Sequence, residues 1–228
     1  MITCEEIYDL HITGALESAL CEAYREIPLD SRNSMRKNDT PLHMACAFAD
    51  ENAVRILLER GADVNVRNDD GDTPLCVLAK RKCCGKETTI AGIAGLLVSK
   101  EARVPRSGKN TTALIEAVGN RHFLMADILL MSGCRIDSTN SNGDNVLHVI
   151  CQSAGDIAYD IKRTKERIAD FSERWYSEKD KREAYENMEY LEEADRQCFL
   201  TAKRILENGQ IDTEDKNNIG KTALDIAW

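Results

Sequence analysis

Two short stretches combine residue types that can carry out chemistry. "KCCGKETT" at 82–89 and "SGKNTT" at 107–112 each place a Gly-Lys pair near threonines. A phosphate-binding loop needs GxxxxGK followed directly by Ser or Thr, and neither stretch has that spacing. Cys83 and Cys84 stand among basic residues, which favour the reactive thiolate. A nucleophilic cysteine is therefore a minor alternative to the simpler interpretation, an exposed insertion that contains cysteines.

A second set of candidates recurs along the chain. His43, Cys76 and His148 each lie three residues after the start of a similar hexapeptide. Joint metal ligation would require side chains about 4 Å apart, whereas stacked helical units lie on the order of 10 Å apart. Cys46 and Cys151 lie six residues after the same starting point, where a small apolar residue packs. We therefore expect no metal site, no cofactor and no catalytic residue in these series.

The elements that position these residues form a repeat of about 33 residues. The hexapeptides begin at Thr40 and Thr73, 33 residues apart, and the spacing from Thr112 to Asn145 is again 33. A second marker precedes them, in the forms "LLERGADVN", "LLVSKEARV", "LLMSGCRID" and "ILENGQID". A fixed period of this length is the signature of a solenoid, in which each unit packs only on its neighbours.

One unit can be understood from local physics. Thr40 can cap a helix N-terminus in "TPLHMACAFA". The following "ENAVRILLER" places Val54, Leu57 and Leu58 on one helical face, and Gly61 ends that helix. Neither helix can bury its apolar side alone, so stacking on the next pair is required.

The stretch "TPLHMACAFADENAVRILLERGADVNVRNDDGDTPL" resembles the ankyrin repeat almost position by position. The resemblance covers Asp39 to Ser153 and returns from Ala202 to Trp228. It implies an all-α solenoid of helix-turn-helix units, in which the histidine of the hexapeptide is structural and bonds the loop backbone. We expect one domain over residues 1–228, divided into a capping repeat (1–38), regular repeats (39–153), a helical insertion (154–200) and an incomplete last repeat (201–228).

The insertion lies between the two helices of the fourth unit. From Asn145 to Thr222 the spacing is 77 residues, which leaves about 43 extra residues inside that repeat. Apolar residues recur at helical spacing in two runs: Ile157, Thr164, Ile168, Phe171 and Trp175, then Ala184, Met188, Leu191, Ala194, Cys198 and Ile205. We predict an antiparallel helical hairpin whose turn is Ser177 to Lys181 and whose packing anchor is Trp175.

Composition limits the classes of ligand. The net charge of −9 argues against nucleic acid, and the longest apolar run, 90–98, is too short for a membrane span. The start shows no secretory signal, so nine cysteines favour reduced thiols in the cytoplasm; secretion by a signal-less route is the alternative. We expect a monomer that binds no small-molecule substrate.

The resemblance implies a non-enzymatic scaffold that binds a partner protein through a concave surface. That surface consists of the first helix of each repeat and of the polar loops that project between repeats, called finger loops. Phe48 is expected to be an exposed aromatic anchor. Tyrosines of the insertion, beside an acidic run, give a second candidate surface. The alternative is a substrate-recruiting, N-terminal module of a larger enzyme or a secreted bacterial effector. The candidate partner-binding residues are Met35, Arg36, Phe48, Arg67, Asp69, Asp70, Lys80, Arg106, Lys109, Asn120, Thr139, Asn140, Tyr185 and Tyr190.

Overall fold

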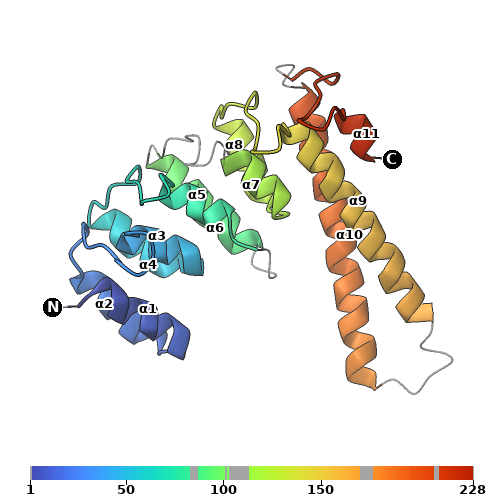
Figure 1. Ribbon diagram of the computed structural model, residues 1–228. Helices are drawn as coiled ribbons and strands as arrows, with labels where there is room; N and C mark the ends of the chain where they lie inside the picture. The colour runs from blue at the N-terminus through green and yellow to red at the C-terminus, as the bar shows by residue number, and fades with distance from the viewer. Residues whose placement is uncertain are drawn as a thin grey trace.

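The fold is a curved stack of helices with a long hairpin near the C-terminus (Figure 1). The computed structural model describes residues 2–82, 87–100, 102, 113–169, 177–207 and 211–227. Within these ranges the only β pairing is an isolated bridge between Asn33 and Asp39. The helices are α1 (Cys4–Thr13), α2 (Glu17–Glu26), α3 (Pro41–Phe48), α4 (Glu51–Glu59), α5 (Pro74–Ala79), α6 (Glu87–Ser99), α7 (Ala113–Gly119), α8 (Phe123–Met131), α9 (Val146–Ala169), α10 (Glu178–Glu207) and α11 (Ala223–Ala227).

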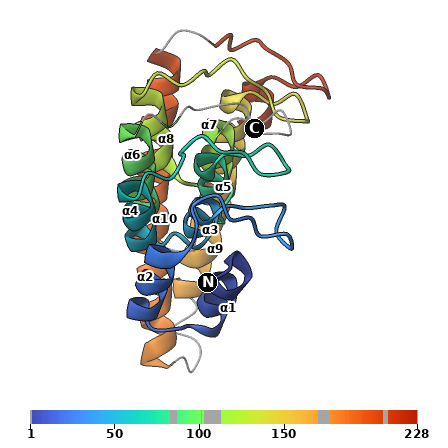
Figure 2. The ribbon, with the colours of Figure 1, turned by 90° about the vertical axis from the view of Figure 1, so that its left-hand side faces the viewer.

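The helices form two parallel rows (Figure 2). In the outer row α2, α4, α6, α8 and α10 each pack on the next, and in the inner row α1, α3, α5, α7, α9 and α11 do the same. The apolar core lies between the rows and includes the fully buried Leu57, Leu78, Ile93 and Phe123. The predicted all-α ankyrin-type solenoid is therefore confirmed.

Local signals start and end the helices as the sequence predicts. Asp50 caps α4 by accepting a hydrogen bond from the Ala53 amide at 2.9 Å. Gly61 follows α4 with φ of 88°, a left-handed conformation that costs glycine little. Val54 and Leu57, at the expected helical spacing, are completely buried.

Asparagines close the finger loops and join neighbouring repeats. In each finger loop the backbone N–H of an asparagine donates across the loop to a backbone carbonyl at 2.8–3.1 Å. These asparagines are Asn33, Asn68, Asn140 and Asn217. The side chain of Asn68 also donates to Asp39 of the preceding loop at 2.8 Å. Asn217 bonds Asp144 in the same way, also at 2.8 Å. These bonds set the spacing of successive loops.

Histidines provide a second link between repeats. Nε2 of His43 lies 3.0 Å from the carbonyl oxygen of Asp72 in the next repeat, and Nδ1 lies 2.8 Å from the Thr40 hydroxyl. Since a carbonyl only accepts, Nε2 must carry the proton. His148 likewise bonds the carbonyl of Lys221 at 3.0 Å. The structural role that the family resemblance implied for both histidines is confirmed.

The predicted hairpin is present as extensions of α9 and α10, which pack along each other. The buried side chains of α10 are the six residues of the predicted apolar run together with Thr201. Ser177 caps α10, because its hydroxyl accepts from the Asp180 amide at 3.1 Å while the Asp180 carboxylate accepts from the Ser177 amide at 3.0 Å. The predicted turn was wrong in position: residues 178–181 form the first turn of α10, because this capping arrangement starts the helix there.

Several predicted residues lie outside the described ranges: Cys83, Cys84, Arg106, Lys109, Phe171 and Trp175.

The seven cysteines inside those ranges are free thiols. Burial raises the pKa of Cys4 and of Cys198 to about 12, so both thiols remain protonated and pack as apolar groups. Among the described helices, none combines the length and the apolar character that a bilayer crossing demands.

Candidate functional site

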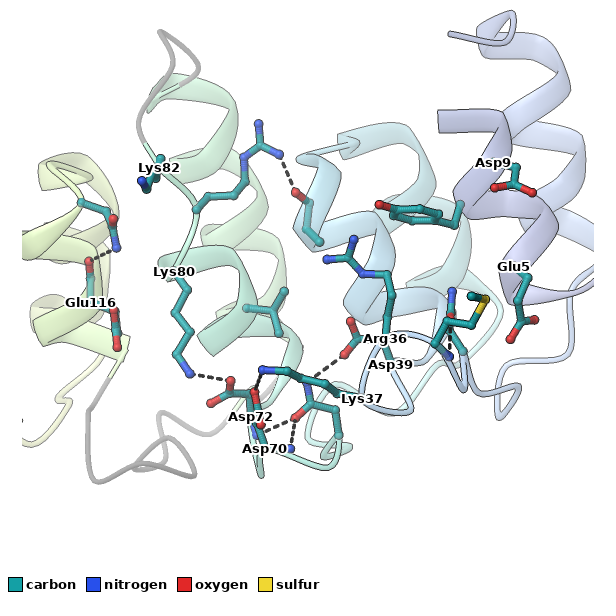
Figure 3. A pocket seen from close by; sticks show the side chains of 18 residues that line it. Glu5, Asp9, Arg36, Lys37, Asp39, Asp70, Asp72, Lys80, Lys82 and Glu116 are labelled. Carbon is teal, nitrogen blue, oxygen red and sulfur yellow. Dashed lines mark hydrogen bonds and ion pairs between the residues drawn. The ribbon is translucent and has the colours of Figure 1, made fainter. Parts of the chain in front are cut away.

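The inner row and the finger loops enclose a concave groove of about 1080 Å³ (Figure 3). It runs from α1 of the capping repeat to α7 of the third regular repeat. Its lining residues are Glu5, Tyr8, Asp9, Asn33, Met35, Arg36, Lys37, Asp39, Ala47, Asn68, Asp70, Asp72, Val77, Lys80, Arg81, Lys82, Glu116 and Asn120.

The finger side of the groove is held by contacts between two loops. Lys37 forms an ion pair with Asp70 of the next finger, and Asn38 donates to Asp69 at 2.8 Å. Lys37 and Asn38 have φ of 54° and 55°, a left-handed turn that Asn tolerates better than most residues. Because two fingers are tied together, this edge of the groove is held in a fixed shape.

The helix side carries cationic and amide groups in fixed positions. Lys80 pairs with the buried carboxylate of Asp72 at 2.5 Å, and its side chain is 28% exposed. Arg81 donates to the carbonyl of Ala47 in the preceding repeat at 2.5 Å. The Asn120 amide does the same to Ala79 at 3.1 Å. Arg81 and Asn120 therefore join adjacent inner helices while they line the groove, and Lys80 is held within its own repeat.

An aromatic cluster forms the N-terminal end of the groove. The guanidinium of Arg36 lies 4.8 Å from the centre of the Tyr8 ring, a cation–π distance. Tyr8 is 5.6 Å from Phe48, which stacks on His11 at 4.1 Å between ring centres. The expectation of an exposed Phe48 was wrong: the ring is half-buried, because α1 supplies Tyr8 and His11 to cover it.

Burial also controls the ionisation of this cluster. Burial lowers the pKa of His11 from its usual value, and the nearby Asp50 carboxylate opposes this effect. Nε2 of His11 lies 2.9 Å from the Tyr24 hydroxyl. The imidazole is therefore a neutral packing partner that connects α1 to the core at neutral pH.

The groove is lined by charged, amide and apolar side chains. Its described lining contains no Cys, Ser, Thr or His side chain. Within the described part of the chain, no cluster of three His, Cys, Asp or Glu side chains could hold a metal ion. The groove presents both acidic and basic side chains, an exposed Met35 and, at its N-terminal end, the ring of Tyr8. Such a surface suits a polypeptide with both charged and apolar side chains.

The structure brings some of the predicted partner-binding residues into this groove. Met35, Arg36, Asp70, Lys80 and Asn120 line it. The remaining described candidates lie elsewhere: Arg67 and Asp69 on the second finger, Phe48 behind Tyr8, Thr139 and Asn140 on the fourth finger, and Tyr185 and Tyr190 on α10.

Sequence reasoning missed the contribution of α1. Glu5, Tyr8 and Asp9 form one end of the groove. A signal for this is present in the sequence, because "EEIYDLH" at 5–11 lies at the start of the capping repeat, where a first helix belongs. A first helix of the capping repeat faces the groove as the first helices of later repeats do.

Comparison with known proteins fits this geometry. The family model described as "Ankyrin repeat" matches residues 37–69. An ankyrin repeat-containing protein of Schizosaccharomyces pombe, P1E11.10, is 34% identical over 68 residues, which cover 27% of this chain and 33% of that protein. Phosphocholine transferase AnkX of Legionella pneumophila is 26% identical over 201 residues, covering 82% of this chain and 20% of AnkX. The chain thus spans a third or less of the length of these curated relatives.

The fold and the matching repeat together define the class. The chain is an ankyrin-repeat protein, with repeats that are themselves non-catalytic and that generally mediate protein–protein interaction. The long hairpin in its fourth repeat adds two extended helices to that scaffold.

Proposed function

We propose that the chain is a protein-binding module whose concave groove holds a segment of a partner protein. The observation that carries the proposal is the groove of about 1080 Å³, whose fingers are tied by the Lys37–Asp70 ion pair and whose helices are tied by the bonds of Arg81 and Asn120 to the preceding repeats. A rigid surface loses less conformational entropy on binding than a mobile one, so more of the contact energy contributes to affinity. The free, buried thiols support action in a reducing compartment.

Site-specific photocrosslinking tests the groove directly. A photoreactive phenylalanine would replace Met35, which is 85% exposed in the groove, and in a separate protein would replace Met131, which is 80% exposed on α8. We expect crosslinks to a partner from position 35 and not from position 131. The double substitution Arg36→Glu with Lys82→Glu should remove the position-35 crosslink. Identical crosslinks from both positions would show that the groove does not select a partner.

A second candidate function is substrate recruitment for a catalytic region of a larger protein. The alignment with phosphocholine transferase AnkX favours it, since 82% of this chain aligns with a fifth of that enzyme. The test is to express the full open reading frame and analyse the groove-bound partner by mass spectrometry. Phosphocholine on the partner that disappears with Arg36→Glu and Lys82→Glu would support recruitment. A partner that binds but carries no phosphocholine would contradict recruitment and would support only the scaffold function.

A further inference from the structure

The charged side chains that line the concave groove are distributed unevenly along it. Two ion pairs, Lys37–Asp70 and Lys80–Asp72, each contain one cation and one acid and contribute no net charge. The other charged groups of the described lining lie in three places. Glu5, Asp9, Arg36 and Asp39 lie at the N-terminal end, Arg81 and Lys82 follow α5, and Glu116, which interacts with another residue of the chain, lies on α7.

The first two of these places have opposite sign. The N-terminal end holds three carboxylates and the single guanidinium of Arg36, a net charge of −2, and we call it the acidic zone. Arg81 and Lys82 form the basic zone. Asp9 and Lys82 are exposed, and neither side chain forms a hydrogen bond or ion pair with another described residue. Figure 3 shows Asp9 and Lys82 toward opposite ends of the groove, so the groove is polarised along its length.

The floor between the two zones is apolar. Tyr8, Ala47 and Val77 line it from α1, α3 and α5. In the inner row α1 packs on α3 and α3 packs on α5. Because packed helices lie about 8–10 Å apart, the two zones are separated by roughly 16–20 Å. An extended chain advances about 3.3 Å per residue and covers this distance in about five or six residues.

We propose that the groove recognises an extended segment of a partner protein with a basic and an acidic residue about five or six positions apart and apolar residues between them. The basic residue lies at Asp9 and Glu5. The acidic residue lies at Lys82 and Arg81. This inference rests on the proposed protein-binding function of the groove and adds the chemistry of the segment. Exposed ion pairs contribute little affinity, so the charges fix the direction and register of the segment, and the apolar floor and Met35 supply contact area.

A segment of uniform charge fits the groove poorly. An acidic segment would meet the carboxylates of α1 at one end, and a basic segment would meet the cations after α5 at the other. Like charges closer than the Debye length, about 8 Å at physiological salt, repel one another. The net charge of −9 belongs to the whole chain and is largely screened beyond that distance. A segment with both signs at the matching ends is attracted to both zones.

Selection from a phage-displayed library of random peptides tests the proposal with the whole chain as bait. Peptides of about 12 residues are long enough to span both zones. Each selected peptide is then crosslinked to a chain in which a photoreactive phenylalanine replaces Met35, so that only groove-bound sequences are counted. We expect these sequences to pair a Lys or Arg with an Asp or Glu about five or six residues away, about threefold more often than the unselected library does.

Two charge reversals should change the selected sequences in opposite ways. With Lys82→Glu the acidic residue of the peptides should give way to a basic one, and with Asp9→Lys the basic residue should give way to an acidic one. A peptide selected on the parent chain should bind each variant about fivefold more weakly in fluorescence anisotropy, and about 0.5 M salt should reduce the difference. The matched controls Lys179→Glu and Asp156→Lys, at exposed positions of the hairpin, should select the same sequences as the parent.

The outcomes separate this inference from the function on which it rests. Groove-bound peptides that lack the paired charges, or that keep the same charges after either reversal, would overturn the polarity and leave the groove a protein-binding site. Peptides that crosslink equally from position 35 and from Met131, which is 80% exposed on α8, would contradict the function of the groove and the polarity with it. A selection that yields no groove-bound peptide would do the same.

Discussion

The junction of the first two finger loops and the distal hairpin are held together by different kinds of contact. At the junction, Asn68 bonds Asp39, Lys37 pairs with Asp70, and His43 bonds the Asp72 carbonyl, all between repeats. In the distal hairpin the helices meet through small and apolar side chains, and the cross-helix bond from Asn187 to Thr164 measures 3.2 Å.

The difference shows how one chain builds both a rigid surface and an extended arm. Polar bonds between repeats have strict geometry, so they fix the positions of the fingers that line the groove. Apolar packing along two long helices tolerates small displacements more easily. Ion pairs on the hairpin, such as Lys181–Glu178 and Arg196–Glu193, stay within one helix and do not join the two.

The largest expected effect is in the solenoid core. Leu78→Ala removes a completely buried side chain of α5 and should lower the free energy of unfolding by about 2–5 kcal/mol. Urea denaturation followed by circular dichroism measures it. The control Leu224→Ala, at a side chain that is 65% exposed, should change stability little. Equal losses for the two variants would contradict the placement of the core.

Next in size is the histidine link between repeats. His43→Ala leaves the Thr40 amide and the Asp72 carbonyl without their buried partner and should cost about 2–3 kcal/mol. Hydrogen exchange should then accelerate in the first two regular repeats, α3 to α6, more than in α9 and α10. Uniform acceleration along the chain would mean that the repeats unfold as one unit and that the contrast with the hairpin does not affect local stability.

Acid should weaken the same link selectively. Burial lowers the pKa of His43 from its usual 6.5, with the Asp72 carbonyl bond opposing it, and burial also lowers the pKa of His122. Because the unfolded chain binds protons more readily at these groups, stability is full above pH 6.5 and declines as the pH falls below it. The urea midpoint should decrease from pH 7 to pH 5, and His43→Gln should reduce that decrease. A flat profile in the parent protein would refute the argument.

The smallest effect is expected in the hairpin. Asn187→Ala removes its bond to Thr164 at a largely exposed position and should cost less than about 1 kcal/mol. Differential scanning calorimetry against the parent protein measures the change. A loss as large as that of His43→Ala would show that the hairpin too depends on a specific polar contact.

The repeat period was sufficient to predict the main architecture. Apolar residues at helical spacing, such as Leu191 and Cys198, identified the packed face of the hairpin because burial follows from periodicity alone. The position of the hairpin turn could not be obtained in the same way. Ser177 and the polar residues after it suit both a turn and the first turn of a helix, and the reciprocal bonds of Asp180 decide for the helix.

The groove was predictable only in part. Finger residues such as Met35 and Asp70 follow from the repeat, since each unit places its loop on the same side. The burial of Phe48 was not predictable, because it depends on His11 and Tyr8 from a capping repeat that departs from the common pattern. Contacts between a regular and an irregular unit require the three-dimensional arrangement.

The unbroken length of α10 has a mechanical consequence. About 20 of its 30 residues extend beyond its contacts with Asp127 of α8, a distance of about 30 Å at 1.5 Å per residue. A tilt of about 10° at that base would move the tip by about 5 Å, close to one helical turn. A small change of tilt at the end of the stack would therefore displace the tip of the hairpin by several times more than its base, and the Arg121–Asp160 ion pair at 3.0 Å opposes such a tilt.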